Sequence, residues 1–597
     1  MIPVRADGPL RDFAEAGVLS AADVHVALRL SRLGGEADPD VLLAAALAVR
    51  GVRTGSVCVD LATVAASVLP ADDDPSGGAD AVATEDLPWP QGWDALQGSP
   101  LVAVGAAAGW RPLRLVDGLL YLDRYWQQEQ LVRRELEDRA ARPVPPVDLS
   151  GLAALFPGPA PDRQRLAVAV AASRGVSVLT GGPGTGKTHT VARLLALLRA
   201  QPGPVPRIAL AAPTGKAAAQ LQESVRQQAA DVGLPADLTA STLHRLLGWR
   251  PDSRSRFRHH AGNHLPYDVV VVDESSMVSL TLMARLLEAV RPDARLVLVG
   301  DPDQLTPVEA GAVLSDLVHR PAPVEPAPLP ALVEADGDLD AEERRQLRNG
   351  VVRLRVPHRF GAEIGALAEA VRTGDADLAV ALLEAGGVLT LTDDEQPLRD
   401  ELLEQAATLR AAGQEGDAAG ALRLLGRHRL LCAHRHGPYG VSHWNAQVQA
   451  WTGTRPGEWQ PGEPLLVTAN DYEVGLYNGD TGVVVATPDG LRAAFDRPGG
   501  AELLPASRLS SVQAVHALTV HRSQGSQYDA VSVLLPPQDS PLLTRELLYT
   551  AVTRAGQRVR VVGTADAVRA AVERQVVRAS GLRRALGATP LAGRQLS

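Results

Sequence analysis

The ten residues GGPGTGKTHT at 181–190 restrict the fold of this chain more than any other stretch. The apolar run VSVLT (176–180) precedes them and fits a buried strand, and from residue 188 onward apolar side chains recur at helical spacing. Between a strand and a helix, the spacing G-x-x-x-x-G-K-T is typical of a loop whose backbone N–H groups hold phosphates at a helix N-terminus. The sequence therefore predicts an α/β nucleotide-binding domain with a parallel sheet.

The residues of this loop have separate expected roles toward ATP and Mg²⁺. The glycines let backbone amides converge on the phosphates, Lys187 reaches the β- and γ-phosphates, and the Thr188 hydroxyl holds Mg²⁺. The expected nucleotide-binding residues of the loop are Gly181, Gly182, Pro183, Gly184, Thr185, Gly186, Lys187 and Thr188.

Lysine is almost absent from the chain. Of 59 lysines and arginines, only Lys187 and Lys216, the latter in APTGKAAAQ, are lysine. A compact ammonium fits inside a ring of N–H groups whereas a planar guanidinium does not, which accounts for Lys187. A general bias toward arginine explains the depletion of lysine but not these two exceptions.

Two further strands are expected to bring polar side chains to the same site. The run DVVVVDE (268–274) ends in Asp273, expected to hold Mg²⁺, and Glu274, expected to orient or deprotonate the attacking water. Adjacent acids after a strand are often only a solvated strand end, but after a phosphate loop they complete an ATPase site. The run RLVLVGD (295–301) leads to Gln304, which can bond a γ-phosphate or water.

Composition is that of a soluble globular protein. At 597 residues the chain has room for about three or four domains. Its net charge of −10 argues against a protein that coats a polyanion but allows a local basic groove. Cys58 and Cys432 are too few for a disulfide framework or a four-cysteine zinc site. The start does not resemble a signal peptide and no apolar run is long enough to span a membrane, so a cytoplasmic protein is expected.

The Pro-, Gly- and acid-rich stretches 70–90 and 320–343 are expected to be surface loops that are either disordered or face a partner.

Read in order, the motifs resemble those of superfamily 1 DNA helicases, in the subgroup that moves 5′ to 3′. The resemblance is carried by GGPGTGKT, APTGKAAAQL, STLHRLLG, VVDESSM, GDPDQLTPV, VPHRF, TVHRSQGSQYD and LLYTAVTRA. From about residue 50 onward the chain more specifically resembles the RecD family, the alpha subunits of RecBCD-type helicase–nucleases. That closer likeness rests on GSVCVDLATVA (55–65), PLRLVDGLLYLDRYWQQE (112–129) and LCAHRHGPYGVSHWN (431–445).

The resemblance implies roles for further residues around ATP. Gln164 would read the adenine. Arg359 in VPHRF and Arg554 in YTAVTRA would be arginine fingers that reach the γ-phosphate from a second RecA-like domain. A guanidinium acts there only when the cleft is closed, which couples hydrolysis to domain motion. Gln527 in SQGSQYD departs from the family, where an acid is common, and puts a ribose contact there in doubt.

The resemblance also implies contacts to the backbone of single-stranded DNA. Small hydroxyls and N–H groups at helix starts hold phosphates without reading sequence. The expected DNA-binding residues are Thr214, Lys216, Thr242, His244, Thr519, His521 and Ser523. For Lys216 three alternatives stay open: a contact to DNA, a contact that caps the ATP site, and a solvated helix lysine without a role.

The implied fold is α/β, with two RecA-like P-loop motor domains, an inserted small SH3-like β-barrel and a mainly helical N-terminal domain. The expected bounds are 1–150 for an N-terminal partner-binding domain, 151–353 for the first motor and 354–597 for the second. A basic hairpin at about 250–267, with Arg254, Arg256, Arg258, His259 and His260, resembles a pin that splits duplex DNA, or is a solvated hairpin without a role. The alternating strands at about 460–512 are the SH3-like insertion.

The expected function is that of an ATP-dependent 5′-to-3′ DNA helicase and single-stranded-DNA-dependent ATPase within a complex that processes double-strand breaks for recombinational repair. The expected partners are single-stranded, tailed or broken duplex DNA, and RecB-like (beta) and RecC-like (gamma) subunits in a heterotrimer, with no membrane. A RecD-like helicase that acts alone is the nearest alternative. A small-molecule P-loop kinase would leave the second half unexplained, and a silent scaffold would not need Lys187, Glu274 and Arg554. The chain itself is expected to cut no DNA.

Overall fold

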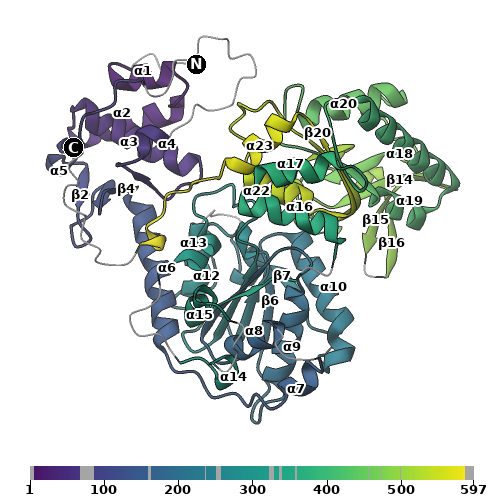
Figure 1. Cartoon of the computed structure of the whole chain (residues 1–597), viewed down its shortest axis with the longest axis horizontal. Coiled ribbons are helices and arrows are strands. Elements are labelled where there is room, and N and C mark those ends of the chain that lie inside the picture. Colours follow the sequence, from purple (N-terminus) through teal and green to yellow (C-terminus); the bar gives the residue numbers. More distant parts are fainter. Residues whose placement is uncertain are drawn as a thin grey trace.

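The residues that the computed structural model describes form four β-sheets with helices around them (Figure 1). The described ranges are 6–67, 86–158, 163–235, 237–250, 257–321, 328–334, 339–356, 359–455, 457–471, 473–497 and 499–584. Within these ranges, none of the helices combines the length and the apolar character needed to cross a bilayer.

The first sheet contains the phosphate loop and has six parallel strands in the order β10-β5-β9-β8-β6-β7. Its strands are β5 (Val176–Gly181), β6 (Ile208–Ala212), β7 (Ala240–Thr242), β8 (Val269–Val272), β9 (Arg295–Gly300) and β10 (Val351–Leu354). The prediction of buried parallel strands from continuous apolar runs is confirmed, since β5 and β8 are buried along their whole length.

Helices cover both faces of this sheet, because successive strand side chains point to opposite faces. One core joins α8, α9 and α10 to residues such as Val271 and Val297, and the other joins α12 and α13 to neighbours such as Val270 and Leu296. The helices of this part are α7 (Leu152–Leu155), α8 (Arg163–Ala172), α9 (Lys187–Arg199), α10 (Gly215–Val232), α11 (Leu243–Leu247), η2 (Ser275–Met277), α12 (Leu280–Ala289), α13 (Val313–His319), α14 (Ala331–Glu334) and α15 (Ala341–Arg348).

Part of the stretch 320–343 corrects the expectation of a surface loop. Short helix α14 places Val333 in the core, with the exposed area of this side chain reduced to zero, and Asp340 and Glu343 form a capping box that starts α15. A single apolar turn after a proline-rich run is enough to dock here, and average composition does not reveal it. Residues 70–85 of the other expected loop, and 322–327 and 335–338 of this one, lie outside the described residues.

The second sheet has five parallel strands in the order β11-β20-β19-β12-β18. Its strands are β11 (Leu389–Thr392), β12 (His428–Cys432), β18 (Ala517–Thr519), β19 (Tyr528–Leu534) and β20 (Ala555–Val562). One core contains α16, α17, α22 and α23, and a second contains α18 and α20. The helices are α16 (Ala362–Thr373), α17 (Ala376–Glu384), α18 (Gln396–Glu415), α19 (Ala418–Leu425), α20 (Val441–Thr452), α21 (Val520–Ser523), α22 (Arg545–Val552) and α23 (Ala565–Glu573).

The N-terminal region combines helices with a small sheet in the order β1-β4-β3-β2. Its helices are α1 (Pro9–Glu15), α2 (Ala21–Gly34), α3 (Pro39–Arg53), α4 (Val64–Ser67), α5 (Ala95–Gly98) and α6 (Asp123–Ala141), and its strands β1 (Cys58–Asp60), β2 (Val102–Val104), β3 (Leu113–Val116) and β4 (Leu119–Leu122). The region is therefore mainly helical as expected, with a sheet that the sequence reading did not foresee.

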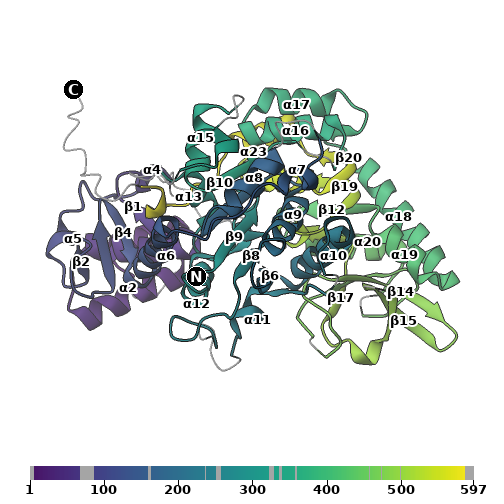
Figure 2. The same ribbon diagram turned by 90° about the horizontal axis from the view of Figure 1, so that it is seen from below.

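An antiparallel sheet in the order β16-β15-β14-β13-β17 interrupts the second motor between α20 and β18. The predicted turn at TPDG joins β14 to β15. The strands are β13 (Pro464–Val467), β14 (Thr481–Thr487), β15 (Gly490–Arg497), β16 (Gly500–Pro505) and β17 (Val512–Ala514), with η3 (Ala506–Arg508) after β16. This sheet and the N-terminal region lie at opposite ends of the molecule (Figures 1 and 2).

After α23 the chain returns to the first half of the molecule. We call residues 575–584, which include η4 (Gly581–Arg583), the C-terminal strap. Its Ala579 carbonyl accepts from the backbone N–H of Val57 at 2.9 Å, and Arg583 pairs with the buried Asp316 of the first motor at 2.7 Å. Leu582 is buried in the first motor's core. The strap therefore ties the second motor to both other parts.

Candidate active site

The loop between β5 and α9 has the backbone of a phosphate-binding loop. Gly184 and Gly186 have φ angles of 78° and 84°, in the left-handed region that only glycine adopts without strain. A Cβ on Gly184 would lie 2.3 Å from the Cβ of Arg359, and one on Gly186 would lie 2.3 Å from Nε2 of Gln164. The loop is thus packed so closely that side chains at these positions are excluded.

Lys187 stands at the start of α9 with its ammonium inside the loop. Its Nζ donates to the carbonyl oxygens of Gly181 at 2.7 Å and Gly182 at 3.0 Å. Gln164 of α8 lies against the loop and donates from Nε2 to the Thr185 carbonyl at 3.3 Å. The phosphate loop, the lysine and the glutamine expected to read adenine therefore lie together, as the sequence predicts.

The two acids after β8 lie at the same edge of the sheet. Glu274 has a φ of 50°, which costs a non-glycine residue about 1 kcal/mol. Its N–H donates to the Asp273 carboxylate at 2.8 Å. Burial and the neighbouring Glu274 raise the pKa of Asp273 to about 6. Asp273, Glu274 and Thr188 line the same cavity, and carboxylate and hydroxyl oxygens are ligands of the kind that Mg²⁺ prefers, so the residues present fit this ion.

Gln304 follows β9 and is buried. Its Nε2 donates to Asp301 at 3.0 Å, while its Oε1 is buried and has no hydrogen-bond partner within the described part of the chain. An orphaned buried acceptor is costly. A donor such as a water molecule beside bound phosphate would satisfy it.

Two arginines enter the site from the second half of the chain. Arg359 follows β10, and Arg554 follows α22 and is buried. Arg554 donates to the carbonyl oxygens of Thr550 at 3.1 Å and Ser526 at 3.5 Å. Partial desolvation beside the cavity and the neighbouring Arg554 lower the pKa of Arg359 to about 10, although the residue remains exposed. Two guanidinium groups that repel each other make a site for an anion such as a phosphate.

These side chains line one cavity of about 680 Å³ between the two sheets. Its wall contains all the predicted catalytic residues, whereas Gln164, Gly181, Gly182 and Thr185 are not among the residues that line it. Among its lining residues are Pro183, Gly184, Gly186, Lys187, Thr188, Asp273, Glu274, Gln304, Arg359 and Arg554. The cavity is large enough for a nucleotide, since ligand pockets span about 300–1,000 Å³.

Comparison with known proteins decides the family. Residues 15–121 match the model of the N-terminal domain of RecBCD enzyme subunit RecD, residues 164–310 that of an AAA domain and residues 514–562 that of the UvrD-like helicase C-terminal domain. The RecBCD enzyme subunit RecD of Mycolicibacterium smegmatis is 55% identical over 97% of this chain and 99% of that protein. The chain belongs to the RecD family.

A second RecD relative, from Mycobacterium tuberculosis, is 51% identical over 98% of each chain. The ATP-dependent RecD2 DNA helicase of Deinococcus radiodurans is 36% identical, over 67% of this chain and 48% of that protein. These two RecD subunits thus match this chain over nearly its whole length, whereas the RecD2 match covers less than half of that relative. This RecD-family chain is a DNA helicase subunit.

Three threonines with expected DNA contacts in this RecD-family chain are helix N-caps. The hydroxyls of Thr214, Thr242 and Thr519 accept from the backbone N–H three residues on, at 3.2, 3.2 and 3.3 Å. Burial lowers the pKa of His244 and of His521, so both imidazoles favour the neutral form. Ser523 differs, because its side chain is buried and its hydroxyl donates to the Val520 carbonyl at 2.7 Å.

Lys216 of the RecD-family chain contacts the second motor. Its Nζ donates to the Ser526 hydroxyl at 2.6 Å. The preceding Gly215 is covered by Tyr477 from the loop between β13 and β14, since a Cβ there would lie 2.4 Å from the ring. None of the three alternatives for Lys216 included this bridge between the motors, and its bond to Ser526 argues against a solvated lysine without a role.

The expected basic hairpin is only partly described. Residues 251–256, with Arg254 and Arg256, lie outside the described residues. Trp249 pairs with Phe257 in an antiparallel bridge, and a tight turn joins His260 to Asn263. Arg258 and His259 follow Phe257, so two of the expected basic residues stand between the bridge and the turn.

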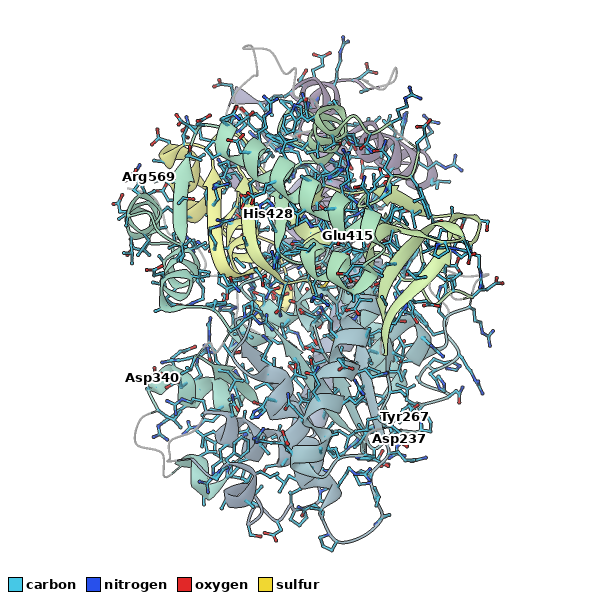
Figure 3. The ribbon with its side chains drawn as sticks, turned by 90° about the vertical axis from the view of Figure 1, so that its right-hand side faces the viewer. Asp237, Tyr267, Asp340, Glu415, His428 and Arg569 are labelled. Atoms are coloured by element: carbon cyan, nitrogen blue, oxygen red, sulfur yellow. The ribbon has the colours of Figure 1, made fainter. Side chains whose placement is uncertain are left out.

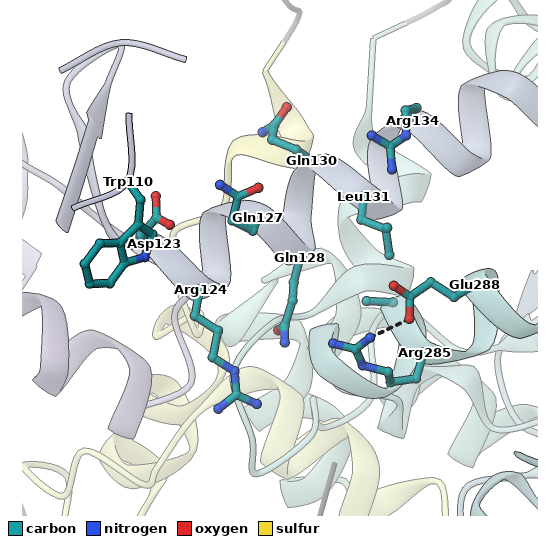
Figure 4. Close-up of a pocket in the computed structure, with 11 residues that line it drawn as sticks. Trp110, Asp123, Arg124, Gln127, Gln128, Gln130, Leu131, Arg134, Arg285 and Glu288 are labelled. Atoms are coloured by element: carbon teal, nitrogen blue, oxygen red, sulfur yellow. Dashed lines mark hydrogen bonds and ion pairs between the residues drawn. The ribbon is translucent and has the colours of Figure 1, made fainter. Parts of the chain in front are cut away.

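A second cavity, of about 520 Å³, lies between α6 and α12, away from the phosphate loop (Figure 4). Trp110 and Arg124 line one end, and Arg285 with its partner Glu288 lines the other. It contains none of the residues assigned to ATP, so the cavity between the sheets is the candidate active site of this RecD-family chain.

Two contacts at the site escaped sequence reasoning. Tyr549 donates from its hydroxyl to Asp301 at 3.2 Å, and Thr550 accepts from the Leu305 N–H at 2.9 Å. They join the Gln304 loop to α22 across the two sheets. Both residues belong to the motif LLYTAVTRA, so their position in that motif was the available indication that they lie at the site.

Proposed function

We propose that this chain is an ATP-dependent DNA helicase and single-stranded-DNA-dependent ATPase that moves 5′ to 3′ as the RecD subunit of a RecBCD-type complex. The observation that carries the proposal is the convergence of Lys187, Glu274 and Arg554, from both halves of the chain, on one cavity. A site assembled from two motors is complete only when they close, so hydrolysis and relative motion are coupled. The direction of movement comes from the family likeness alone.

In and around that cavity each residue has a proposed task. Gln164 binds adenine, the loop amides of 181–188 and Lys187 hold the phosphates, and Gln304 bonds the γ-phosphate or the attacking water. Glu274 orients or deprotonates that water, and Arg359 with Arg554 stabilises charge on the transferred phosphoryl group. Thr188 and Asp273 would hold Mg²⁺, which neutralises phosphate charge when bound.

DNA is proposed to run across the starts of α10, α11 and α21. Helix N-termini capped by Thr214, Thr242 and Thr519 present N–H groups suited to phosphates, and His244 and His521 lie beside two of them. Lys216 and Ser523 are proposed to support this surface from behind, because both side chains are engaged by protein. The hairpin near 250–267 would split the duplex ahead of the motors.

The proposed domains are a partner-binding region at 1–150, a first motor at 151–353 and a second at 354–597 that carries an SH3-like barrel at about 460–512. The antiparallel order of β13 to β17 supports that barrel. RecB-like and RecC-like subunits are the proposed partners, with the N-terminal region docking on the RecC-like one, in the cytoplasm. The end-to-end match to RecD subunits favours the complex over a helicase that acts alone.

DNA-stimulated ATP hydrolysis tests this function. The purified chain should hydrolyse ATP many-fold faster with single-stranded DNA, and should unwind a duplex with a 5′ tail but not one with a 3′ tail. Hydrolysis indifferent to DNA would favour a kinase-like enzyme, and no hydrolysis would favour a scaffold. Unwinding that needs a 3′ tail would refute the direction. Co-purification with two larger subunits tests the complex.

A further inference from the structure

Two neutral residues of the loop between α21 and β19 accept hydrogen bonds from three cationic side chains. With its amide oxygen turned toward the guanidinium, Gln527 accepts from Nη2, Nη1 and Nε of Arg359 at 2.6, 2.7 and 3.1 Å. The adjacent Ser526 accepts from Lys216 through its hydroxyl at 2.6 Å and from Arg554 through its carbonyl at 3.5 Å. Both arginines of the active site are therefore held by consecutive residues of one loop.

The loop belongs to the second motor and is anchored on the first. Lys216 belongs to α10 of the first motor, and Gln524 of the loop donates to the Leu305 carbonyl, next to Gln304, at 3.1 Å. Ser526 is buried, whereas the Gln527 side chain is exposed on the cavity wall. The backbone at 526–527 thus has a fixed position from which the Gln527 amide reaches into the cavity.

The neutrality of Gln527 matters for the arginine that it holds. A carboxylate binds a guanidinium as an ion pair, often through two parallel hydrogen bonds, whereas a neutral amide oxygen offers hydrogen bonds without an opposite charge. A carboxylate at this position would pair with Arg359 and also repel the phosphates. An amide fixes the direction of the guanidinium yet leaves its charge free for a stronger, anionic partner.

We propose that Gln527 is a positioning residue for Arg359: it aims the guanidinium across the cavity before the nucleotide binds and yields it to the γ-phosphate as the motors close. The inference rests on the proposed function, since Arg359 must act in ATP hydrolysis. Ser526, next to Gln527, contacts Lys216 of the first motor and Arg554 of the second. A shift of this loop therefore moves Gln527, and changes the contacts of the loop to both motors at the same time.

Two nearly isosteric variants test the role. Gln527→Met removes the acceptor and should lower kcat of DNA-stimulated hydrolysis about tenfold, the effect of one hydrogen bond to a charged group, with the KM for ATP within about twofold. Gln527→Glu should lower kcat and also raise the KM for ATP, because its charge faces the phosphates. Gln557→Met, on the exposed face of β20, is the matched control and should behave as the wild type.

A double-mutant cycle separates positioning from a structural effect. In an Arg359→Ala background, Gln527→Met should cause no further loss of kcat. If turnover there is too slow, the same cycle is measured as the gain in affinity for ADP on adding aluminium fluoride. Multiplicative losses, or wild-type kcat in both single variants, would overturn this inference alone. A wild-type chain without DNA-stimulated hydrolysis would overturn the proposed function and this inference with it.

Discussion

Lys187 and Lys216 show how a single side chain is chosen for its shape. The Lys187 ammonium bonds two carbonyl oxygens inside the phosphate loop, and Lys216 reaches one hydroxyl across the cleft between the motors. Both are end-on contacts by a small cation on a thin stem. A planar guanidinium has a wider head and five donors in a fixed fork, so it does not fit either place without moving its neighbours.

Replacing Lys187 tests this fit. Lys187→Ala should abolish ATP hydrolysis and unwinding, a loss of at least about 100-fold, because the phosphate charge loses its partner. Lys187→Arg should fail nearly as badly although it keeps the charge. Steady-state ATPase rates with single-stranded DNA measure both, with thermal unfolding as the check on folding. An Arg variant at the wild-type rate would contradict the argument from shape.

At the scale of elements, two buried histidines of the second motor make its stability depend on pH. His428 on β12, labelled in Figure 3, bonds Ser532 at 2.9 Å, and Nε2 of His516, just before β18, has no partner within the described residues. Burial and nearby arginines, Arg429 foremost, lower the pKa of His428 to about 3 and that of His516 to about 4. Both are therefore neutral in the folded chain at pH 5.

Stability should fall as pH drops below about 6.5, because the unfolded chain then binds protons that the folded chain does not. The loss is at most about 1.4 kcal/mol per pH unit for each histidine. Urea unfolding midpoints between pH 7 and pH 5 measure it. His428→Gln and His516→Gln should each flatten the pH dependence, and the exposed His25→Gln should not. Equal slopes in all variants would refute the assignment.

Elements with a local signature could be predicted, and contacts between distant segments could not. Continuous apolar runs identified β5, β6, β8 and β9, since a strand buried on both faces leaves that mark whatever surrounds it. The spacing of the motifs likewise pointed to side chains that line the cavity between the two sheets, among them Lys187, Glu274 and Arg554. Gln527 bonding Arg359 and Lys216 bonding Ser526 depend on how two separately folded motors meet. The local pattern of apolar and polar residues carries no information about such contacts between the motors.

At the scale of the whole molecule, the division of labour between helicase and nuclease follows from the positions of the two lysines. One common type of nuclease site combines Mg²⁺-binding carboxylates with a lysine that positions water. Lys187 and Lys216 are both engaged in the motors, and neither is preceded two residues earlier by an acid, since Thr185 and Thr214 stand there.

The purified chain should therefore leave DNA uncut. End-labelled linear DNA incubated with Mg²⁺, ATP and the chain alone should keep its length, while a 5′-tailed duplex in the same tube is unwound. Degradation that persists in Lys187→Ala would reveal a separate nuclease site. Cleavage that appears only when two larger partners are added would support the division of labour.

The C-terminal strap has a consequence for the chain as the ribosome makes it. Glu129 of α6 accepts from the Gly581 N–H at 2.9 Å, and Asp316 of α13 is paired with Arg583, yet both acids are synthesised more than 250 residues before these partners. Domains of a growing chain generally fold in order of emergence. Here the N-terminal region and the first motor are made before Leu582, which fills part of their core. Until the strap is made, Glu129 and Asp316 also lack their partners Gly581 and Arg583. A nascent chain therefore exposes apolar surface of the kind that chaperones protect, and η4 covers this surface once the second motor has been made.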